Sequence, residues 1–106
     1  MQKYLLKKAG QLLHLMQAGG YKLTFAESCT GGLLAAAFTS CPGASDALSM
    51  GFVTYADSAK EQLLGVPSDM LFEYTAVSEP VAAAMSKGAK ARAQADLALA
   101  LTGWAG

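Results

Sequence analysis

Apolar side chains recur at helical spacing near the start of the chain. Leu5, Ala9, Leu12 and Met16 lie on one face of a helical wheel. A pair of glycines follows them, and paired glycines are a common helix stop. The pattern therefore predicts an amphipathic helix over residues 2–18 whose apolar face packs against another layer.

Alternating and alanine-rich segments follow this helix. Residues 22–26 alternate and contain Thr24 and Phe25, which favours a short strand. Residues 33–39 are rich in alanine and predict a helix. The aromatic and β-branched side chains of residues 50–55 predict a second strand.

The second half of the chain predicts helices followed by a strand. Short helices are expected over residues 57–64 and 68–74, and Ser78 is placed to cap a longer helix. Residues 97–101 are an uninterrupted apolar run, which is typical of a strand buried on both faces. The order of elements predicts an α/β layered domain with a partly parallel, mixed sheet. A buried strand without a later partner would have an open edge, so we expect the last elements to lie beyond residue 106.

Composition and charge narrow the class of protein. The chain has 106 residues, 53% of them hydrophobic, so it has the size of one domain and can form a core. Eight basic and eight acidic side chains balance without a run of like charge, which argues against nucleic acid as a partner. No segment has the pattern of a signal peptide or a membrane span. We therefore expect a soluble, cytoplasmic protein with no membrane partner, and a homo-oligomer is left open.

The cysteines and the histidine do not form a metal or disulfide pattern. Cys29, Cys41 and His14 are widely spaced, so we expect no metal site. Cys29 could be a nucleophile beside a helix start, but its small neighbours favour a packing role. Cys41 lies in a Pro-Gly turn and is a weaker candidate, and His14 is expected at the surface. Trp104 is expected either to stack on a ligand ring or to cover the core.

Polar residues stand at the carboxyl end of each predicted strand. Functional residues of open α/β sheets gather at these ends, and they converge in one crevice if the strands pair in parallel. The candidates are Glu27 and Ser28 after the first strand, Tyr55 and Lys60 after the second, and Thr102 and Gly103 after the third.

Ser28 precedes the glycine-rich start of a predicted helix, at Thr30, Gly31 and Gly32. Free backbone N–H groups at such a point favour an anion or an oxyanion, and glycine lets the backbone approach a ligand closely. The competing interpretation is purely structural, with Ser28 or Thr30 as an N-cap and the glycines as a tight turn. The local pattern does not decide between the two.

Lys60 lies about one helical turn beyond the second strand. A serine hydroxyl needs a base to become a nucleophile, and a desolvated lysine can act as one. The alternative is an ordinary surface lysine. Glu27 could form an ion pair with Lys60, orient a substrate, or be an exposed carboxylate at the end of a strand.

Several longer runs resemble the signature of the CinA C-terminal domain family. They are AESCTGGLLA at 26–35, GFVTY and AK at 51–55 and 59–60, LGVP at 64–67, AVSE at 76–79 and LTGWAG at 101–106. Any one of them alone has low specificity, but together they occur in the family's order over residues 22–106. We therefore identify residues 1–106 as a single domain of this type, incomplete at its C-terminus.

The resemblance implies a three-layer α/β/α sandwich that hydrolyses the carboxamide of nicotinamide mononucleotide to nicotinic acid mononucleotide and ammonia. It implies Ser28 as the nucleophile and Lys60 as its base, assisted by polar residues matching Tyr55 and Thr102. The implied partner is a small-molecule nucleotide, and no metal or cofactor is required.

Two departures from the family pattern bear on these expectations. A Pro-Gly-Gly segment, further strands and an arginine implicated in the site usually follow, and they are absent here. Trp104 stands where a smaller apolar residue is more usual. Two alternatives therefore stay open, a nucleotide-binding or regulatory module without turnover and an inactive part of an amidase. A buried Lys60 within reach of Ser28 would favour catalysis.

Overall fold

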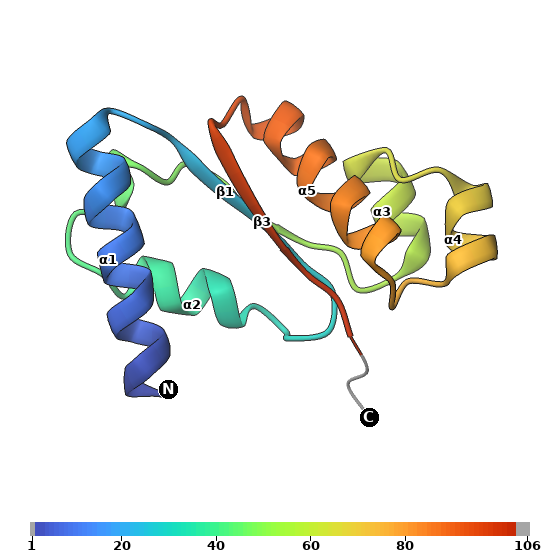
Figure 1. Ribbon diagram of the computed structural model, residues 1–106, viewed down its shortest axis with the longest axis horizontal. Helices are drawn as coiled ribbons and strands as arrows, with labels where there is room; N and C mark the ends of the chain where they lie inside the picture. The colour runs from blue at the N-terminus through green and yellow to red at the C-terminus, as the bar shows by residue number, and fades with distance from the viewer. Residues whose placement is uncertain (1, 104–106) are drawn as a thin grey trace.

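The computed structural model describes residues 2–103 (Figure 1). Its elements are α1 (Lys3–Gly19), β1 (Leu23–Glu27), α2 (Leu33–Thr39), the 3-10 turn η1 (Ala44–Asp46), β2 (Phe52–Val53), α3 (Asp57–Leu64), α4 (Ser68–Tyr74), α5 (Glu79–Ala93) and β3 (Leu97–Leu101). The elements predicted from the pattern are confirmed, although the second strand is shorter than expected. The Ser78 cap is also confirmed, because its hydroxyl accepts a hydrogen bond from the Val81 N–H at 3.3 Å.

The three strands form a parallel sheet in the order β2-β1-β3. Ala26 pairs with Phe52 on one side of β1 and with Ala100 on the other. The expected parallel pairing is therefore confirmed. The antiparallel part of the expected mixed sheet is not among the strands of residues 2–103.

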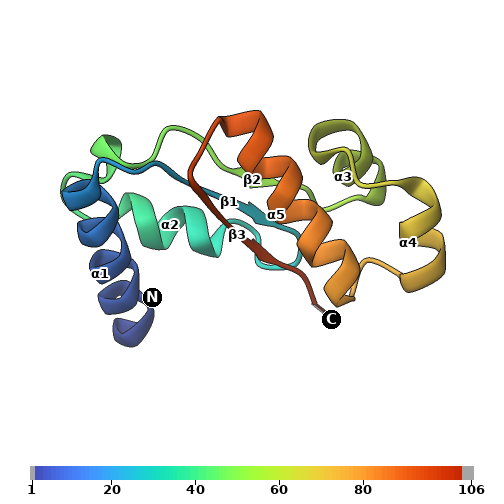
Figure 2. The ribbon, with the colours of Figure 1, turned by 45° about the horizontal axis from the view of Figure 1, so that its top comes forward.

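Helices cover both faces of the sheet, which confirms the three-layer α/β/α architecture. Figures 1 and 2 show α1 and α2 on one side of the strands and α3, α4 and α5 on the other. No helix within residues 2–103 combines the length and apolar character needed to cross a membrane.

Each face of the sheet has its own hydrophobic core. On the α1 and α2 side, the rings of Phe25 and Phe38 stack with their centres 5.9 Å apart. On the other side, Ala26 packs against α3 and α5. Gly88 of α5 lies so close to the Leu64 carbonyl of α3 that a Cβ there would clash. The small residues of α5 therefore bring it close to its neighbour.

The expectation that residues 97–101 are buried on both faces is wrong for the described residues. Leu97 and Leu101 of β3 are exposed and its other residues are half-buried, because β3 lies at an edge of the described sheet. The strand buried on both faces is the central β1, although its sequence contains Thr24 and Glu27. Burial is set here by position in the sheet, and the polar side chains of β1 are buried together with hydrogen-bond partners.

Candidate active site

The three strand ends converge at one edge of the sheet, as the parallel pairing requires. Ser28 donates its backbone N–H to the Leu101 carbonyl at 3.1 Å, and Thr54 donates its own to the Glu27 carbonyl at 2.8 Å. These bonds continue the parallel ladder by one residue beyond β1. Ser28 therefore stands in register with Thr54 on one side and Thr102 on the other.

This row of hydroxyl residues belongs to the face that α3, α4 and α5 cover. Side chains in register on parallel strands point to the same face, and successive side chains alternate. Two positions before the row, Ala26, Phe52 and Ala100 all pack in the α3–α5 core. This alternation predicts that Ser28, Thr54 and Thr102 face the layer of α3–α5, and Thr102 does so through its bond to the Ala76 carbonyl.

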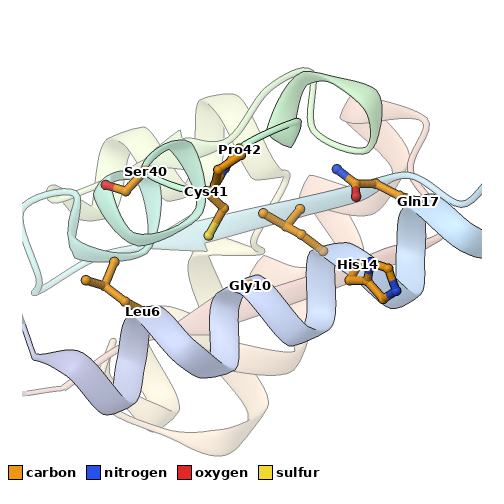
Figure 3. A pocket seen from close by; sticks show the side chains of 8 residues that line it. Leu6, Gly10, His14, Gln17, Ser40, Cys41 and Pro42 are labelled. Atoms are coloured by element: carbon orange, nitrogen blue, oxygen red, sulfur yellow. The ribbon is translucent and has the colours of Figure 1, made fainter.

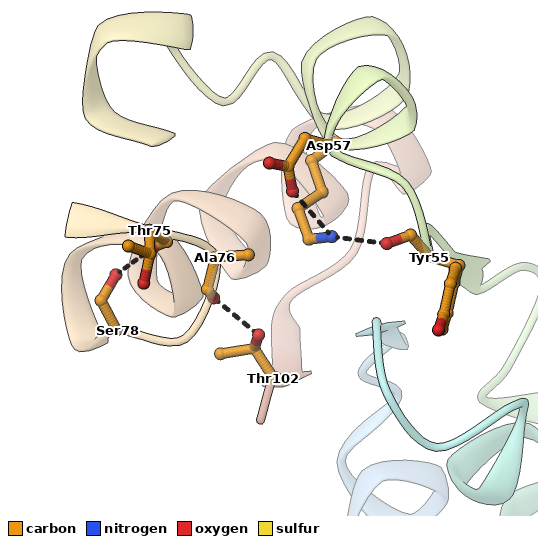
Figure 4. Close-up of polar contacts among 7 residues, drawn as sticks. Tyr55, Asp57, Thr75, Ala76, Ser78 and Thr102 are labelled. Carbon is orange, nitrogen blue, oxygen red and sulfur yellow. Dashed lines mark hydrogen bonds and ion pairs between the residues drawn. The ribbon is translucent and has the colours of Figure 1, made fainter. Parts of the chain in front are cut away.

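Lys60 is fully buried on α3, so the surface-lysine interpretation is wrong. Its Nζ donates a hydrogen bond to the Tyr55 carbonyl at 3.0 Å and lies 3.6 Å from an oxygen of Asp57 (Figure 4). The Asp57 side chain is 62% exposed, so water weakens this ion pair. The carbonyl at the strand end and the buried stem of the lysine fix the amine at the carboxyl edge.

Tyr55 and Thr102 reach this edge in different ways. The Tyr55 side chain is 76% exposed, and its ring points away from the amine that its carbonyl binds (Figure 4). The Thr102 hydroxyl donates to the Ala76 carbonyl at 2.6 Å, which ties the end of β3 to the loop between α4 and α5 (Figure 4). That bond uses the proton of the hydroxyl and leaves its oxygen able to accept.

Glu27 is fully buried and turns to the opposite face of the sheet. Its carboxylate accepts hydrogen bonds from the Thr30 hydroxyl at 2.6 Å and from the N–H groups of Leu34 and Ala35 at 2.7 and 3.0 Å. One possibility raised for Glu27, an ion pair with Lys60, is not formed, because the carboxylate caps α2 instead. The exposed-carboxylate interpretation is wrong as well. Glu27 holds the loop after Ser28 against the first turn of α2.

The loop between Ser28 and α2 has the backbone conformation that its glycines favour. Gly31 and Gly32 have φ values of +65° and +102°, in a region that side chains disfavour. No hydrogen bond within residues 2–103 uses the N–H groups of Thr30, Gly31 or Gly32. Gly103 lies beside this loop, since a Cβ on it would be 3.5 Å from the Cys29 sulfur.

The remaining candidates lie at the edge of this arrangement or outside it. Cys29 is half-buried in the loop. His14 is exposed, as expected, and lines a separate hollow of about 400 Å³ between α1 and the turn after α2 (Figure 3). Cys41 lines the same hollow and packs against Gly10. The proposals for Trp104 fall outside the described residues.

No three His, Cys, Asp or Glu side chains gather into a potential metal site within residues 2–103. The polar groups of the site are hydroxyls, one amine and backbone N–H groups. Such a set can attack a carbonyl carbon, accept a proton and bind a developing negative charge.

Sequence reasoning missed one residue of this row, Thr54. Its hydroxyl is buried and has no hydrogen-bond partner among the described residues. The alternation of residues 50–55 could have located it, because Thr54 follows Phe52 by two positions and shares its face. Threonine is common in strands, so its presence there does not indicate a functional residue. The missing hydrogen-bond partner of its hydroxyl becomes visible only in the structure.

The fold and site define a class of protein: three-layer α/β domains with a polar site at the carboxyl edge of a parallel sheet. Comparison with known proteins identifies the member of that class. The CinA C-terminal domain family matches residues 6–106, and the chain belongs to this family.

Relatives and solved structures agree with this assignment. A CinA-like protein of Akkermansia muciniphila is 50% identical over 97% of this chain and 26% of its own length. One from Geobacter sulfurreducens is 54% identical over 87% of the chain and 22% of its own length. The chain therefore spans about a quarter of these relatives.

Two crystal structures have the same fold. The competence/damage inducible protein CihA from Agrobacterium tumefaciens matches with a TM-score of 0.96 and 39% identity, over 100% of this chain and 64% of that one. A competence-damaged protein (CinA) superfamily protein from Escherichia coli matches with a TM-score of 0.93 and 40% identity, over 100% and 63%.

Proposed function

We propose that this domain hydrolyses the carboxamide of nicotinamide mononucleotide, giving nicotinic acid mononucleotide and ammonia. The observation that carries the proposal is the fully buried Lys60 amine, which the Tyr55 carbonyl binds at the same strand ends where Ser28 lies. A lysine at the surface costs no desolvation free energy. Burying a lysine amine does cost free energy, and buried amines occur often at functional sites. The signature runs of the sequence supply the substrate class, and a nucleotide substrate fits a cytoplasmic location.

In the first half of the reaction, the Ser28 oxygen attacks the amide carbon. The serine proton passes to the Lys60 amine, and the carbonyl oxygen becomes an oxyanion. The N–H groups of Thr30, Gly31 and Gly32, which make no hydrogen bond to any residue from 2 to 103, would hold this charge. Lys60 then gives the proton to the amide nitrogen, the C–N bond breaks, and ammonia leaves an ester on Ser28.

In the second half, water attacks the ester and gives its proton to Lys60. The carbon–Oγ bond breaks, Ser28 recovers its proton, and the acid product leaves. Glu27 positions the loop throughout, since its hydrogen bonds to Thr30, Leu34 and Ala35 hold the oxyanion donors beside the nucleophile.

The contacts of Lys60 are compatible with a base. A neutral amine has two N–H donors and one lone pair. The Tyr55 carbonyl accepts from one donor, and an Asp57 oxygen lies 3.6 Å from Nζ, beyond hydrogen-bond distance, so these contacts leave the lone pair to take a proton. A lysine that only bound a phosphate would have no need for burial beneath a strand end.

Ammonia release tests the proposal. The 106-residue chain and a chain continued past Gly106 are given nicotinamide mononucleotide, and ammonia and bound nucleotide are both measured. Release by either chain supports the amidase, and release by the longer chain alone means that residues beyond Gly106 complete the site. Binding without release by both chains would contradict the amidase and favour the nucleotide-binding module.

A further inference from the structure

Asp57 forms an ion pair with the buried amine of the candidate site (Figure 4). One of its carboxylate oxygens lies 3.6 Å from the Lys60 Nζ. Asp57 is the first residue of α3 and Lys60 follows it by three positions, a spacing that places two side chains on the same side of a helix. No other carboxylate within residues 2–103 lies within 4 Å of this amine.

The Asp57 carboxylate does not cap the helix that it begins. Acidic side chains at the start of a helix often accept hydrogen bonds from its free N–H groups. The residue before α3 is Ala56, and no side chain among the described residues caps this helix. What remains for the carboxylate is the helix dipole, which acts on any acid in the first turn, and the Lys60 amine, which is specific to this position.

The elements packed around Lys60 bring no second charge to its amine among residues 2–103. On the side of the helices, α5 contributes apolar side chains to the core beside α3, namely Val81, Met85 and Ala89. On the side of the sheet, Glu27 caps α2 on the opposite face, and the Tyr55 ring points away from the amine. The other charged residues of α3, α4 and α5 are exposed and form no ion pair with Lys60; they are Glu61, Asp69, Glu73, Glu79, Lys87, Lys90 and Arg92.

In the proposed reaction Lys60 begins neutral and becomes charged. Its Nζ accepts the Ser28 proton and becomes an ammonium, while the substrate oxygen becomes negative. An opposite charge a few ångströms away favours an ammonium over a neutral amine. The Asp57 side chain is 62% exposed, so water weakens this attraction but does not remove it.

We propose that Asp57 is a positioning residue that acts through Lys60. Its carboxylate stabilises the ammonium form and thereby sets the pH range in which this amine accepts a proton. Without the carboxylate, the amine is neutral down to a lower pH, and the neutral amine is a weaker base. The inference rests on the proposed function for the source of the proton, which is Ser28.

Two readouts test the inference, on the chain and on its continuation past Gly106. The first is an NMR titration of lysine side chains labelled with ¹³C at Cε, in which the Lys60 signal is the one that Lys60→Met removes. The second is the pH dependence of ammonia release from nicotinamide mononucleotide. The variants are Asp57→Asn, which removes the charge at nearly constant shape, and Asp57→Glu, which keeps it. Glu61→Gln on the exposed surface of α3 is the control, because it removes the same charge away from the amine.

Loss of the carboxylate should move both curves to lower pH. In Asp57→Asn, the midpoint of the Lys60 titration should fall by about 0.3 to 1 pH unit, as for a partly exposed ion pair. The rising limb of the rate should move by the same amount, because the lone pair is then free at lower pH. The plateau of the rate should fall about two- to fivefold, because the amine is a weaker base. Asp57→Glu and Glu61→Gln should each stay within about 0.2 pH unit of the unaltered chain.

The titration decides the inference, and the rate decides the function. A Lys60 midpoint that moves by less than about 0.3 pH unit in Asp57→Asn, or by as much in Glu61→Gln, would overturn the inference. That result combined with lower stability would mean that Asp57 only supports the start of α3. A shifted titration with an unshifted rate would uphold the role of Asp57 and contradict Lys60 as the base. A shifted titration without ammonia release by any chain would uphold the role of Asp57 and contradict the amidase.

Discussion

The two ends of the sheet differ in how many of their polar groups have hydrogen-bond partners. At the amino end, Thr24 donates to Met50, and Lys22 donates its backbone N–H to Asp96 and its amine to the Asp46 carbonyl. At the carboxyl end, neither the Thr54 hydroxyl nor the N–H groups of Thr30, Gly31 and Gly32 have a hydrogen-bond partner among residues 2–103. Polar groups at the first end hold the fold together, whereas several at the second end remain available for a ligand or a proton.

Among the substitutions at the two ends, Ser28→Ala should have the largest effect on ammonia release. If Ser28 is the nucleophile, ammonia release should fall about 10⁴-fold or more. Binding of nicotinamide mononucleotide, measured by calorimetry, should stay largely intact because the loop N–H groups remain. Retained turnover would move the nucleophile assignment to Cys29.

Lys60 should show the next largest effect. Lys60→Met keeps the length and the apolar stem but removes the proton acceptor, so ammonia release should fall about 10² to 10⁴-fold. Lys60→Arg should be nearly as damaging, because a guanidinium stays protonated. Lys90→Met on the exposed face of α5 is the control and should keep the normal rate. Normal ammonia release by Lys60→Arg would contradict the base and would mean that Lys60 acts only through its positive charge.

Glu27→Gln tests a carboxyl-end group that serves the fold. The amide group can no longer accept from both Leu34 and Ala35, so the free energy of unfolding should fall by about 1.5–3 kcal/mol. Ammonia release should fall as well, because the loop that holds the oxyanion loosens. Thr24→Val should cost about 1 kcal/mol in stability and leave turnover unchanged. Equal activity loss in both variants would mean that the two ends do not differ.

Cys29→Ala should have the smallest effect. Cys29 is half-buried beside Gly103, so its role is steric and most activity should remain. The measurement is again ammonia release, with Cys41→Ala as the matched control at the α1 hollow. A loss as deep as that of Ser28→Ala would reverse the order of the two candidate nucleophiles.

The helices and strands could be predicted from the sequence because they depend on local patterns. The convergence of the strand ends was conditional on parallel pairing, which only the structure establishes. Residues 33–39, 57–64 and 68–74 form the predicted helices. The roles of polar side chains could not, because those depend on contacts across the fold. Glu27 serves α2 on the face away from Lys60, and only the register reveals this.

The exposure of β3 and the unpaired hydroxyl of Thr54 could not be predicted from the sequence, because both depend on contacts across the fold. An apolar run such as residues 97–101 predicts a strand, but the order of strands decides how deeply it is buried. Thr24 and Thr54 are both threonines in strands, and the sequence alone does not distinguish the bonded hydroxyl from the unpaired one.

The most direct test of the account is the mass of the protein during turnover. A chain that releases ammonia is quenched in acid while it is still consuming nicotinamide mononucleotide. The quenched protein is then digested, and its peptides are analysed by mass spectrometry. If Ser28 is the nucleophile, an ester of nicotinic acid mononucleotide is expected on Ser28 and is absent from Ser28→Ala. A thioester on Cys29, or undiminished turnover by Ser28→Ala, would contradict it.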